Sequence, residues 1–136
     1  MKPSKTKIAK LFSDNPAAML FFFKDITYAV FKRYDLKPYH LKVLVGVHIL
    51  PLWGRTEYPI GTRSKDLLDT GLFAVDGFVS AGLRRLREAG LIYIVERVKS
   101  SKIYNLTDKG IEVLNFVAEC MYKVSTEPKE RKKPIL

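Results

Sequence analysis

Basic side chains occur together with hydroxyl groups in three short stretches between residues 62 and 102 of this chain. Lysine and arginine neutralise phosphate groups, and serine and threonine hydroxyls donate hydrogen bonds to phosphate oxygens. These residue types in this grouping therefore predict a surface that binds a polyanion. The candidate residues are Thr62, Arg63, Ser64 and Lys65 in the first stretch, Ser80, Arg84 and Arg85 in the second, and Arg97, Lys99, Ser100 and Lys102 in the third.

The charge of the chain agrees with an anionic partner. It carries 24 Lys and Arg residues against 14 Asp and Glu residues, a formal charge of +10. Residues 84–102 alone hold six basic and two acidic residues, a local charge of +4. Such an excess favours nucleic acid or an acidic membrane surface, and the alternative is a charged face that serves only solubility. Three basic stretches on adjacent elements favour nucleic acid.

The second basic stretch lies on a predicted amphipathic helix, residues 75–89. Val79, Leu83 and Leu86 recur at helical spacing and are expected in the core, and Gly90 follows as a helix end. Gly82 is expected to pack closely against a neighbouring helix. The outward face, which would enter the major groove of duplex DNA, then offers Asp76, Gly77, Phe78, Ser80, Ala81 and Arg84.

That outward face has few side chains able to read bases. Arg84 is the one residue that can pair with guanine in the bidentate manner. Asp76 is expected to cap the helix, with acceptance of a hydrogen bond from a cytosine amino group as the alternative. Phe78 is expected in the core, with contact to a thymine methyl group as the alternative.

The other two basic stretches lie on elements that flank this helix. The third belongs to a predicted β-hairpin with strands at residues 91–97 and 102–106. The first opens a short helix, residues 63–69, with Thr62 as its N-cap, where backbone N–H groups also favour an anion. Thr70-Gly71 supplies the turn to the next helix, and a short strand at residues 58–60 is expected to pair with the hairpin.

The order of these elements resembles a known family over about residues 16–124. The run Leu83-x-x-Leu86-x-x-x-Gly90-Leu91-Ile92, closed by Leu106-Thr107-Asp108-Lys109-Gly110, resembles the MarR-type regulators. It is also similar to the PadR group, in which a basic residue and a tyrosine precede the Leu-Thr pair, as Lys102 and Tyr104 do here. The resemblance implies a mainly α winged helix-turn-helix with a small β-hairpin wing and flanking N- and C-terminal helices. It further implies a homodimeric transcriptional regulator that binds double-stranded DNA.

The chain is expected to form one domain, residues 14–124, between a flexible basic arm (1–13) and a flexible charged tail (125–136). Pro16 opens the first helix, which runs to Tyr34. Met19, Phe22, Phe23, Ile26 and Val30 share one face of it, while Leu20, Phe31 and Tyr34 lie away from that face. Since one monomer rarely covers two apolar faces of a terminal helix, part of it is expected in a homodimer interface.

The remaining helices complete the predicted core. Residues 39–50 are apolar nearly all round and predict a central helix that Pro51 ends. The last helix, residues 108–124, is expected to have Thr107 as its N-cap. Its apolar stripe contains Ile111, Leu114, Val117, Ala118 and Met121.

Catalysis and metal binding find little support in the sequence. His40 and His48 both lie on the predicted central helix, and no paired-carboxylate site, Gly-rich phosphate loop or Ser-His-Asp set is evident. We therefore expect no enzyme activity, no cofactor and no metal. Cys120 is the only cysteine, which favours a cytoplasmic location, and it is expected to be a buried apolar residue rather than a redox sensor. No apolar run reaches the length of a membrane span.

Two other functions stay open. The scarcity of base-reading side chains, and a hairpin that has Val98-Lys99-Ser100-Ser101-Lys102 in place of the Asp-x-Arg motif of MarR-type wings, would suit a protein-interaction or assembly factor in a replication, partition or mobile-element complex. The first helix and the loop at residues 51–61 would then form the interface. Alternatively, Phe22, Tyr28 and Trp53 would line a site for a small-molecule effector of a regulator, although such aromatic residues are more often core.

Overall fold

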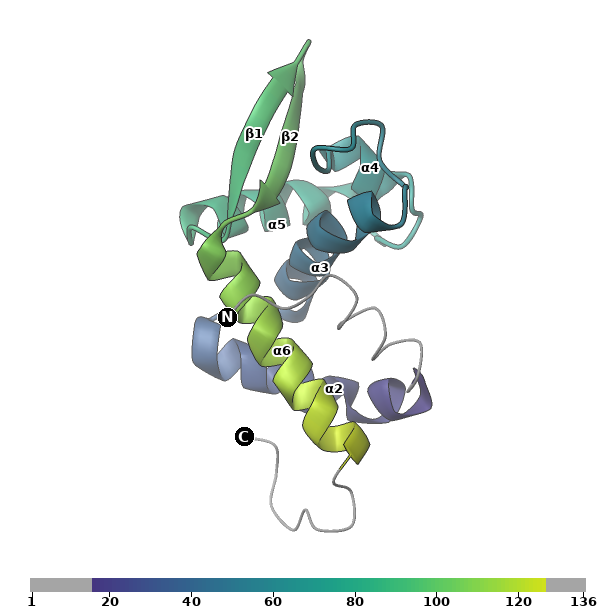
Figure 1. Ribbon diagram of the computed structural model, residues 1–136, viewed down its shortest axis with the longest axis vertical. Coiled ribbons are helices and arrows are strands. Elements are labelled where there is room, and N and C mark those ends of the chain that lie inside the picture. The colour runs from purple at the N-terminus through teal and green to yellow at the C-terminus, as the bar shows by residue number, and fades with distance from the viewer. Residues whose placement is uncertain (1–15, 127–136) are drawn as a thin grey trace. The chain divides into compact units, whose positions relative to one another are not determined.

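The computed structural model describes residues 16–126, with side chains from Phe22 to Lys123. The predicted arm and residues 127–136 of the predicted tail lie outside the described residues. The chain forms mostly helices and one antiparallel hairpin, as predicted (Figure 1). The elements are α2 (Pro16–Tyr34), α3 (Pro38–Leu52), α4 (Ser64–Leu68), α5 (Asp76–Glu88), β1 (Ile92–Val98), β2 (Ser101–Leu106) and α6 (Asp108–Thr126). Contacts divide the chain into two compact units, of which one is Tyr39–Ile111 and the other contains α2 and the rest of α6.

Helices α3 and α5 provide much of the core of the Tyr39–Ile111 unit. Val43, Leu44 and Val47 of α3 are fully buried, as predicted for a central helix. The predicted inward face of α5 is confirmed, because Val79, Leu83 and Leu86 are at most 4% exposed. Gly82 packs closely, as predicted, since a Cβ there would lie 2.7 Å from Val43 Cγ2. The approach of the two helices therefore depends on the absence of a side chain at position 82.

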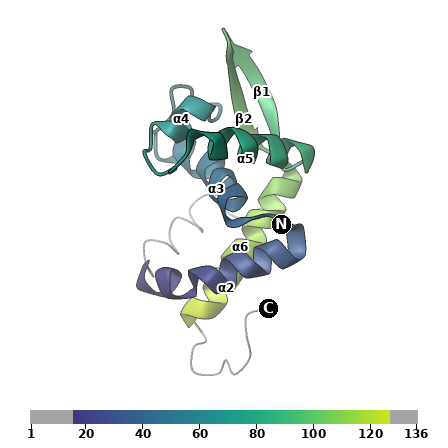
Figure 2. The same cartoon turned by 180° about the vertical axis from the view of Figure 1, so that it is seen from behind.

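The hairpin extends beyond the helices of this unit in both views (Figures 1 and 2). Ile92 pairs with Leu106 at its base and Val98 with Ser101 at its tip, and a bulge at Val95 interrupts the register. A third segment joins β2, but at Thr62 and not at residues 58–60 as predicted. The N–H and C=O groups of Thr62 both bond to the backbone of Tyr104, at 3.0 and 2.9 Å. Thr62 takes this place because its side chain also has a buried partner on α3.

That partner is the backbone carbonyl of Val47, which lacks its usual helical donor because residue 51 is a proline. Pro51 was predicted to end the helix, yet α3 continues through it to Leu52. Proline has no N–H group to bond the carbonyl four residues earlier, which is that of Val47. The hydroxyl of the buried Thr62 donates to this carbonyl at 2.9 Å. The predicted role of Thr62 as N-cap of the next helix is therefore wrong, and the N-cap of α4 is Arg63.

Replacing Thr62 with valine should lower the free energy of unfolding by about 1–3 kcal/mol, since a buried acceptor would lose its donor without a change in side-chain shape. Urea unfolding of both proteins measures the difference. Adding Pro51→Ala restores an N–H group four residues after Val47, so the second substitution should recover part of the loss. An equal loss in the single and double variants would show that the Val47 carbonyl is not the cause.

The unit that contains α2 and α6 buries one side of each helix. Ile26, Ala29 and Val30 of α2 are buried, whereas Phe23, on the predicted apolar face with Ile26 and Val30, is 59% exposed. This unit therefore covers that face only from Ile26 onward. On α6, Leu114, Val117, Ala118 and Met121 are buried as predicted, whereas Ile111 is only half-buried. Cys120 is buried too, and burial raises the pKa of its thiol.

Side-chain contacts join α2 to α6 and cap the start of α6. The edge of the Tyr34 ring meets the Phe116 ring at 5.7 Å, and the Arg33 guanidinium lies 4.8 Å from the centre of the same Phe116 ring. At the other end of α6, the hydroxyl of Thr107 accepts a hydrogen bond from the Gly110 N–H at 3.1 Å. Thr107 is therefore the N-cap of α6, as predicted.

Candidate nucleic-acid interface

An open groove of about 660 Å³ lies between the start of α4, one side of α5 and the end of the hairpin. All of its residues belong to the Tyr39–Ile111 unit. The lining residues are Arg63, Ser64 and Lys65 from the α4 end, Ser80, Leu83, Arg84, Arg87 and Glu88 from α5, and Ser100, Ser101, Lys102 and Tyr104 from the hairpin. The fold thus brings basic residues from all three predicted stretches to one surface.

The positive charge of the groove comes mainly from Arg84, Arg87 and Lys102. All three are exposed, and no ion pair joins any of them to another residue within 22–123. Glu88 is the single acidic residue in the lining. Arg63 and Lys65 also face the groove, but each already pairs with a nearby carboxylate, that of Asp66 and that of Asp69 respectively. The three unpaired cations are therefore the ones most available to an anion.

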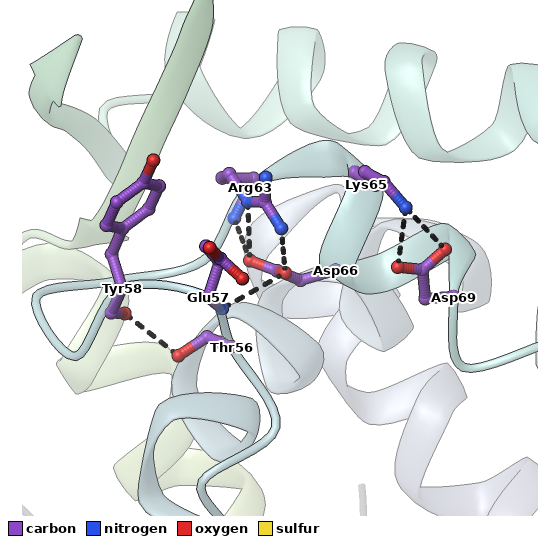
Figure 3. Close-up of polar contacts among 7 residues, drawn as sticks. All are labelled: Thr56, Glu57, Tyr58, Arg63, Lys65, Asp66 and Asp69. Atoms are coloured by element: carbon purple, nitrogen blue, oxygen red, sulfur yellow. Dashed lines mark hydrogen bonds and ion pairs between the residues drawn. The ribbon is translucent and has the colours of Figure 1, made fainter. Parts of the chain in front are cut away.

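Arg63 is held by a buried carboxylate, that of Asp66 (Figure 3). Its Nη2 donates to Asp66 Oδ1 at 2.9 Å and its Nε to Oδ2 at 3.4 Å. The backbone N–H groups of Arg63 and Glu57 donate to the same carboxylate, at 2.8 and 3.4 Å. The guanidinium also lies 5.6 Å from the centre of the Tyr58 ring. Asp66 therefore joins α4, the preceding loop and a groove cation in one network.

This network changes the acidity of Asp66. Burial by itself would raise the pKa of the carboxyl group, but the hydrogen bonds from Arg63 and the Arg63 charge together outweigh burial and hold the pKa below its usual value. The Arg63 pKa is raised in turn, chiefly by the hydrogen bond to Asp66. Lys65 and Asp69 form a second pair at 3.0 Å, but their side chains are 67% and 60% exposed, so water surrounds that pair (Figure 3).

More than half of the predicted site residues meet in the groove. Those that line it are Arg63, Ser64, Lys65, Ser80, Arg84, Ser100 and Lys102. Thr62 was also predicted, but its buried hydroxyl bonds to Val47, so its side chain is not available to a ligand. Arg97 and Lys99 are exposed on the hairpin outside the groove lining, and Arg85 is half-buried and does not line it.

Asp76 and Gly77 are exposed in the first turn of α5, away from the groove lining. The expected capping role of Asp76 is wrong, because Val75 is the N-cap and Asp76 is the first helical residue. Phe78 is 42% exposed, so its expected place in the core is wrong as well. Its ring stacks on that of Tyr39, with centres 5.0 Å apart and planes at 28°.

Several groove residues were not predicted as site residues. Arg87 shares the groove side of α5 with Ser80 and Arg84, and the spacings of four and three residues between them are a signal that could have identified it. The spacing of three residues between Arg63 and Asp66 is a similar signal, since side chains three residues apart can meet on a helix and form an ion pair. Tyr104 lies two residues after Lys102 on β2, and this strand spacing is a signal that could have identified it.

Of the aromatic residues considered for an effector site, Phe22 and Tyr28 belong to the unit that contains α2 and Trp53 belongs to the Tyr39–Ile111 unit. Tyr28 lines a separate hollow along α2 with Lys24, Asp25, Thr27, Phe31 and Pro38. Phe22 and Trp53 do not line that hollow, and Trp53 is 57% exposed in the other unit. The expectation of an effector site therefore gains no support from these side chains.

No protein-family model, curated protein or solved structure matches this chain. The groove and its charges are therefore the features from which a function can be inferred. Within the described range, no three His, Cys, Asp or Glu side chains gather in a way that would hold a metal ion. Among the helices between residues 16 and 126, none combines the length and hydropathy that a membrane crossing requires.

Proposed function

We propose that residues 39–111 form a winged helix-turn-helix domain and that the protein is a transcriptional regulator that binds double-stranded DNA. The order α3, Thr62 segment, α4, α5, β1, β2 supports this proposal, because α4 and α5 would be the helix pair and the hairpin would be the wing. The observation that carries it is the groove, where unpaired cations of α5 and β2 face one open surface.

In this proposal α5 enters the major groove and the hairpin follows the adjacent backbone. A helix with its side chains is about 10–12 Å wide and the major groove is about 12 Å wide, so one helix fits. Arg87 and Lys102 would contact phosphates on either side of the hollow that they line. Arg84, nearer the start of α5 than Arg87, would reach the bases.

A homodimer would place two such domains on successive half-sites. Exposed aromatic side chains on α2 support this part of the proposal. Phe23, Tyr28 and Phe31 are 59%, 48% and 41% exposed, and large apolar side chains gathered on one helix commonly mark an interface. A second copy of the chain is the partner that we propose for α2.

The DNA proposal predicts a loss of salt-dependent affinity when groove cations are removed. Arg84→Ala and Lys102→Ala should each weaken binding to a 30-base-pair duplex, measured by fluorescence anisotropy at several salt concentrations. A variant that loses one phosphate contact should reduce the slope of log K against log salt by about 0.9. An Arg84 contact to guanine would instead cost about 1–3 kcal/mol on one sequence and less on others.

Lys123→Ala is the matched control, because it removes one exposed positive charge from α6 and none from the groove or from α2. It should leave the affinity nearly unchanged. If Lys123→Ala weakened binding as much as the groove variants, the protein would bind DNA through its overall charge alone. If the wild-type protein did not bind any duplex at low salt, the proposal would be wrong.

A second candidate function is a protein-interaction or assembly factor. Trp53 and Ile60, in the loop between α3 and α4, are 57% and 43% exposed, which would suit a partner surface. A partner complex that forms without DNA, resists high salt and is lost in Trp53→Ala would favour this function over DNA binding.

A further inference from the structure

An apolar patch surrounds the start of α5. It consists of Tyr39, Leu72, Phe73, Val75 and Phe78, of which Leu72, Val75 and Phe78 are 66%, 53% and 42% exposed. The patch belongs entirely to the Tyr39–Ile111 unit, and none of its residues lines the basic groove. Exposed side chains of this size in one place commonly mark a binding surface.

Contacts from Tyr39 and Lys42 of α3 hold the patch in position. The Phe78 ring rests on Tyr39, with ring centres 5.0 Å apart. The Lys42 ammonium donates a hydrogen bond to the Leu72 carbonyl oxygen and lies 4.6 Å from the centre of the Phe73 ring. These contacts fix the turn before α5 and the direction of the Phe78 ring. Because the Phe78 ring is already held in place, binding a ligand against it would cost little side-chain entropy.

The chemistry of this end of α5 suits base edges better than phosphates. The one charged side chain in the first turn is Asp76, an exposed acid that would repel a phosphate group. The helix presents its exposed cations farther along, at Arg84 and Arg87, which line the groove. Arg85, about two turns after Phe78, is half-buried. Nine residues separate Phe78 from Arg87, and at about 100° per residue this puts them on opposite sides of the helix. The phosphate-binding side and the apolar side of α5 are thus distinct.

The major groove has one apolar feature that such a ring can contact, the C5-methyl group of thymine. The first turns of a helix in the major groove are the part that reaches the base edges. We propose, on the basis of the DNA-binding function proposed above, that Phe78 supported by Tyr39 recognises thymine methyl groups. The protein would then prefer sites with thymine where the start of α5 enters the groove.

Duplexes that differ only in this methyl group test the proposal without knowledge of the natural site. The probes are a 30-base-pair alternating A-T duplex and the same duplex with uracil in place of every thymine. A second pair is an alternating G-C duplex with cytosine or with 5-methylcytosine. The wild-type protein should bind each methylated duplex about fourfold more tightly for each methyl group that the ring covers, the value expected for one buried methyl-sized group.

Phe78→Ala should bind both members of each pair equally. Tyr122→Ala is the matched control, because Tyr122 of α6 is 52% exposed and lies outside both the patch and α2; it should keep the preference for methylated DNA. Phe78→Leu, which keeps apolar contact, should keep part of the preference, and circular dichroism checks that each variant is folded.

The outcomes separate this inference from the function on which it rests. Equal wild-type affinity for methylated and unmethylated duplexes, with binding still weakened by Arg84→Ala, would overturn the role of Phe78 and leave DNA binding intact. A preference that survives in folded Phe78→Ala would overturn it too, because another group would then read the methyl. Absence of binding to every duplex at low salt would overturn both proposals.

Discussion

Arg63→Ala is expected to lower the free energy of unfolding by about 3 kcal/mol, because it leaves a buried carboxylate without its cation. Asp66 is 5% exposed and receives two hydrogen bonds from the Arg63 side chain. Without them the carboxylate would keep only backbone donors in a place that water barely reaches. Chemical denaturation in urea measures the loss. Since Arg63 also lines the groove, stability and not DNA affinity is the readout.

The second ion pair of the same helix gives a matched control. Lys65→Ala removes an ammonium group whose pair with Asp69 is more than half exposed on both sides. Exposed pairs of this kind contribute about 0–1 kcal/mol. Lys65→Ala should therefore unfold at nearly the wild-type urea concentration. Equal losses for the two variants would show that burial of Asp66 does not decide the strength of its pair.

The same network predicts how stability depends on pH. The pKa of Asp66 lies below its usual value in the folded protein, whereas in the unfolded chain it should be near 3.9, roughly the value for a free aspartate. The ionised carboxylate therefore stabilises the fold above the unfolded-state pKa, and this contribution is lost as pH falls through the folded-state pKa. Asp66→Asn should be less stable than wild type at pH 7, and the difference should shrink below about pH 4. A constant difference would contradict an ionised Asp66.

Gly110→Ala is expected to destabilise the protein by about 1–3 kcal/mol or more, as overpacking does. A Cβ at position 110 would overlap the carbonyl oxygen of Leu91. This part of the backbone has little freedom to move, because the Leu91 carbonyl accepts the Thr107 N–H at 3.0 Å and the Thr107 hydroxyl donates to the Gly90 carbonyl at 2.6 Å. Urea unfolding of the variant measures the effect.

The sign of this effect runs against helix propensity, which makes the test sharp. Replacing glycine with alanine inside a helix normally gains up to about 1 kcal/mol. Gly77→Ala is the matched control, since a Cβ at position 77 of α5 would make only an ordinary contact, 3.8 Å from Val75 Cγ1. Gly77→Ala should leave the stability equal or higher, while Gly110→Ala lowers it. A stabilised Gly110→Ala variant would show that the backbone at the junction of β2 and α6 can move to make room for a Cβ.

The elements with local signals could be predicted from the sequence by itself. Val79, Leu83 and Leu86 repeat at helical spacing, and α5 buries exactly that face. Thr107 has the hydroxyl that an N-cap needs, and it caps α6. Such features depend on residues a few positions apart in the sequence, so periodicity and capping rules can predict them. The same reasoning found most cations of the groove, because basic residues on three neighbouring elements are visible in the sequence.

Tertiary structure alone decided which of these residues are available to a ligand. Thr62 looked like an N-cap, but a proline eleven residues earlier leaves a carbonyl on α3 that its hydroxyl satisfies. Phe78 looked like a core residue, but Tyr39 of α3 supports its ring at the surface. The start of α4 lies beside β2, where both line the groove, because Thr62 pairs with Tyr104. In each case the deciding contact joins elements far apart in the chain, and no local pattern of residue types records which distant partner a side chain will meet.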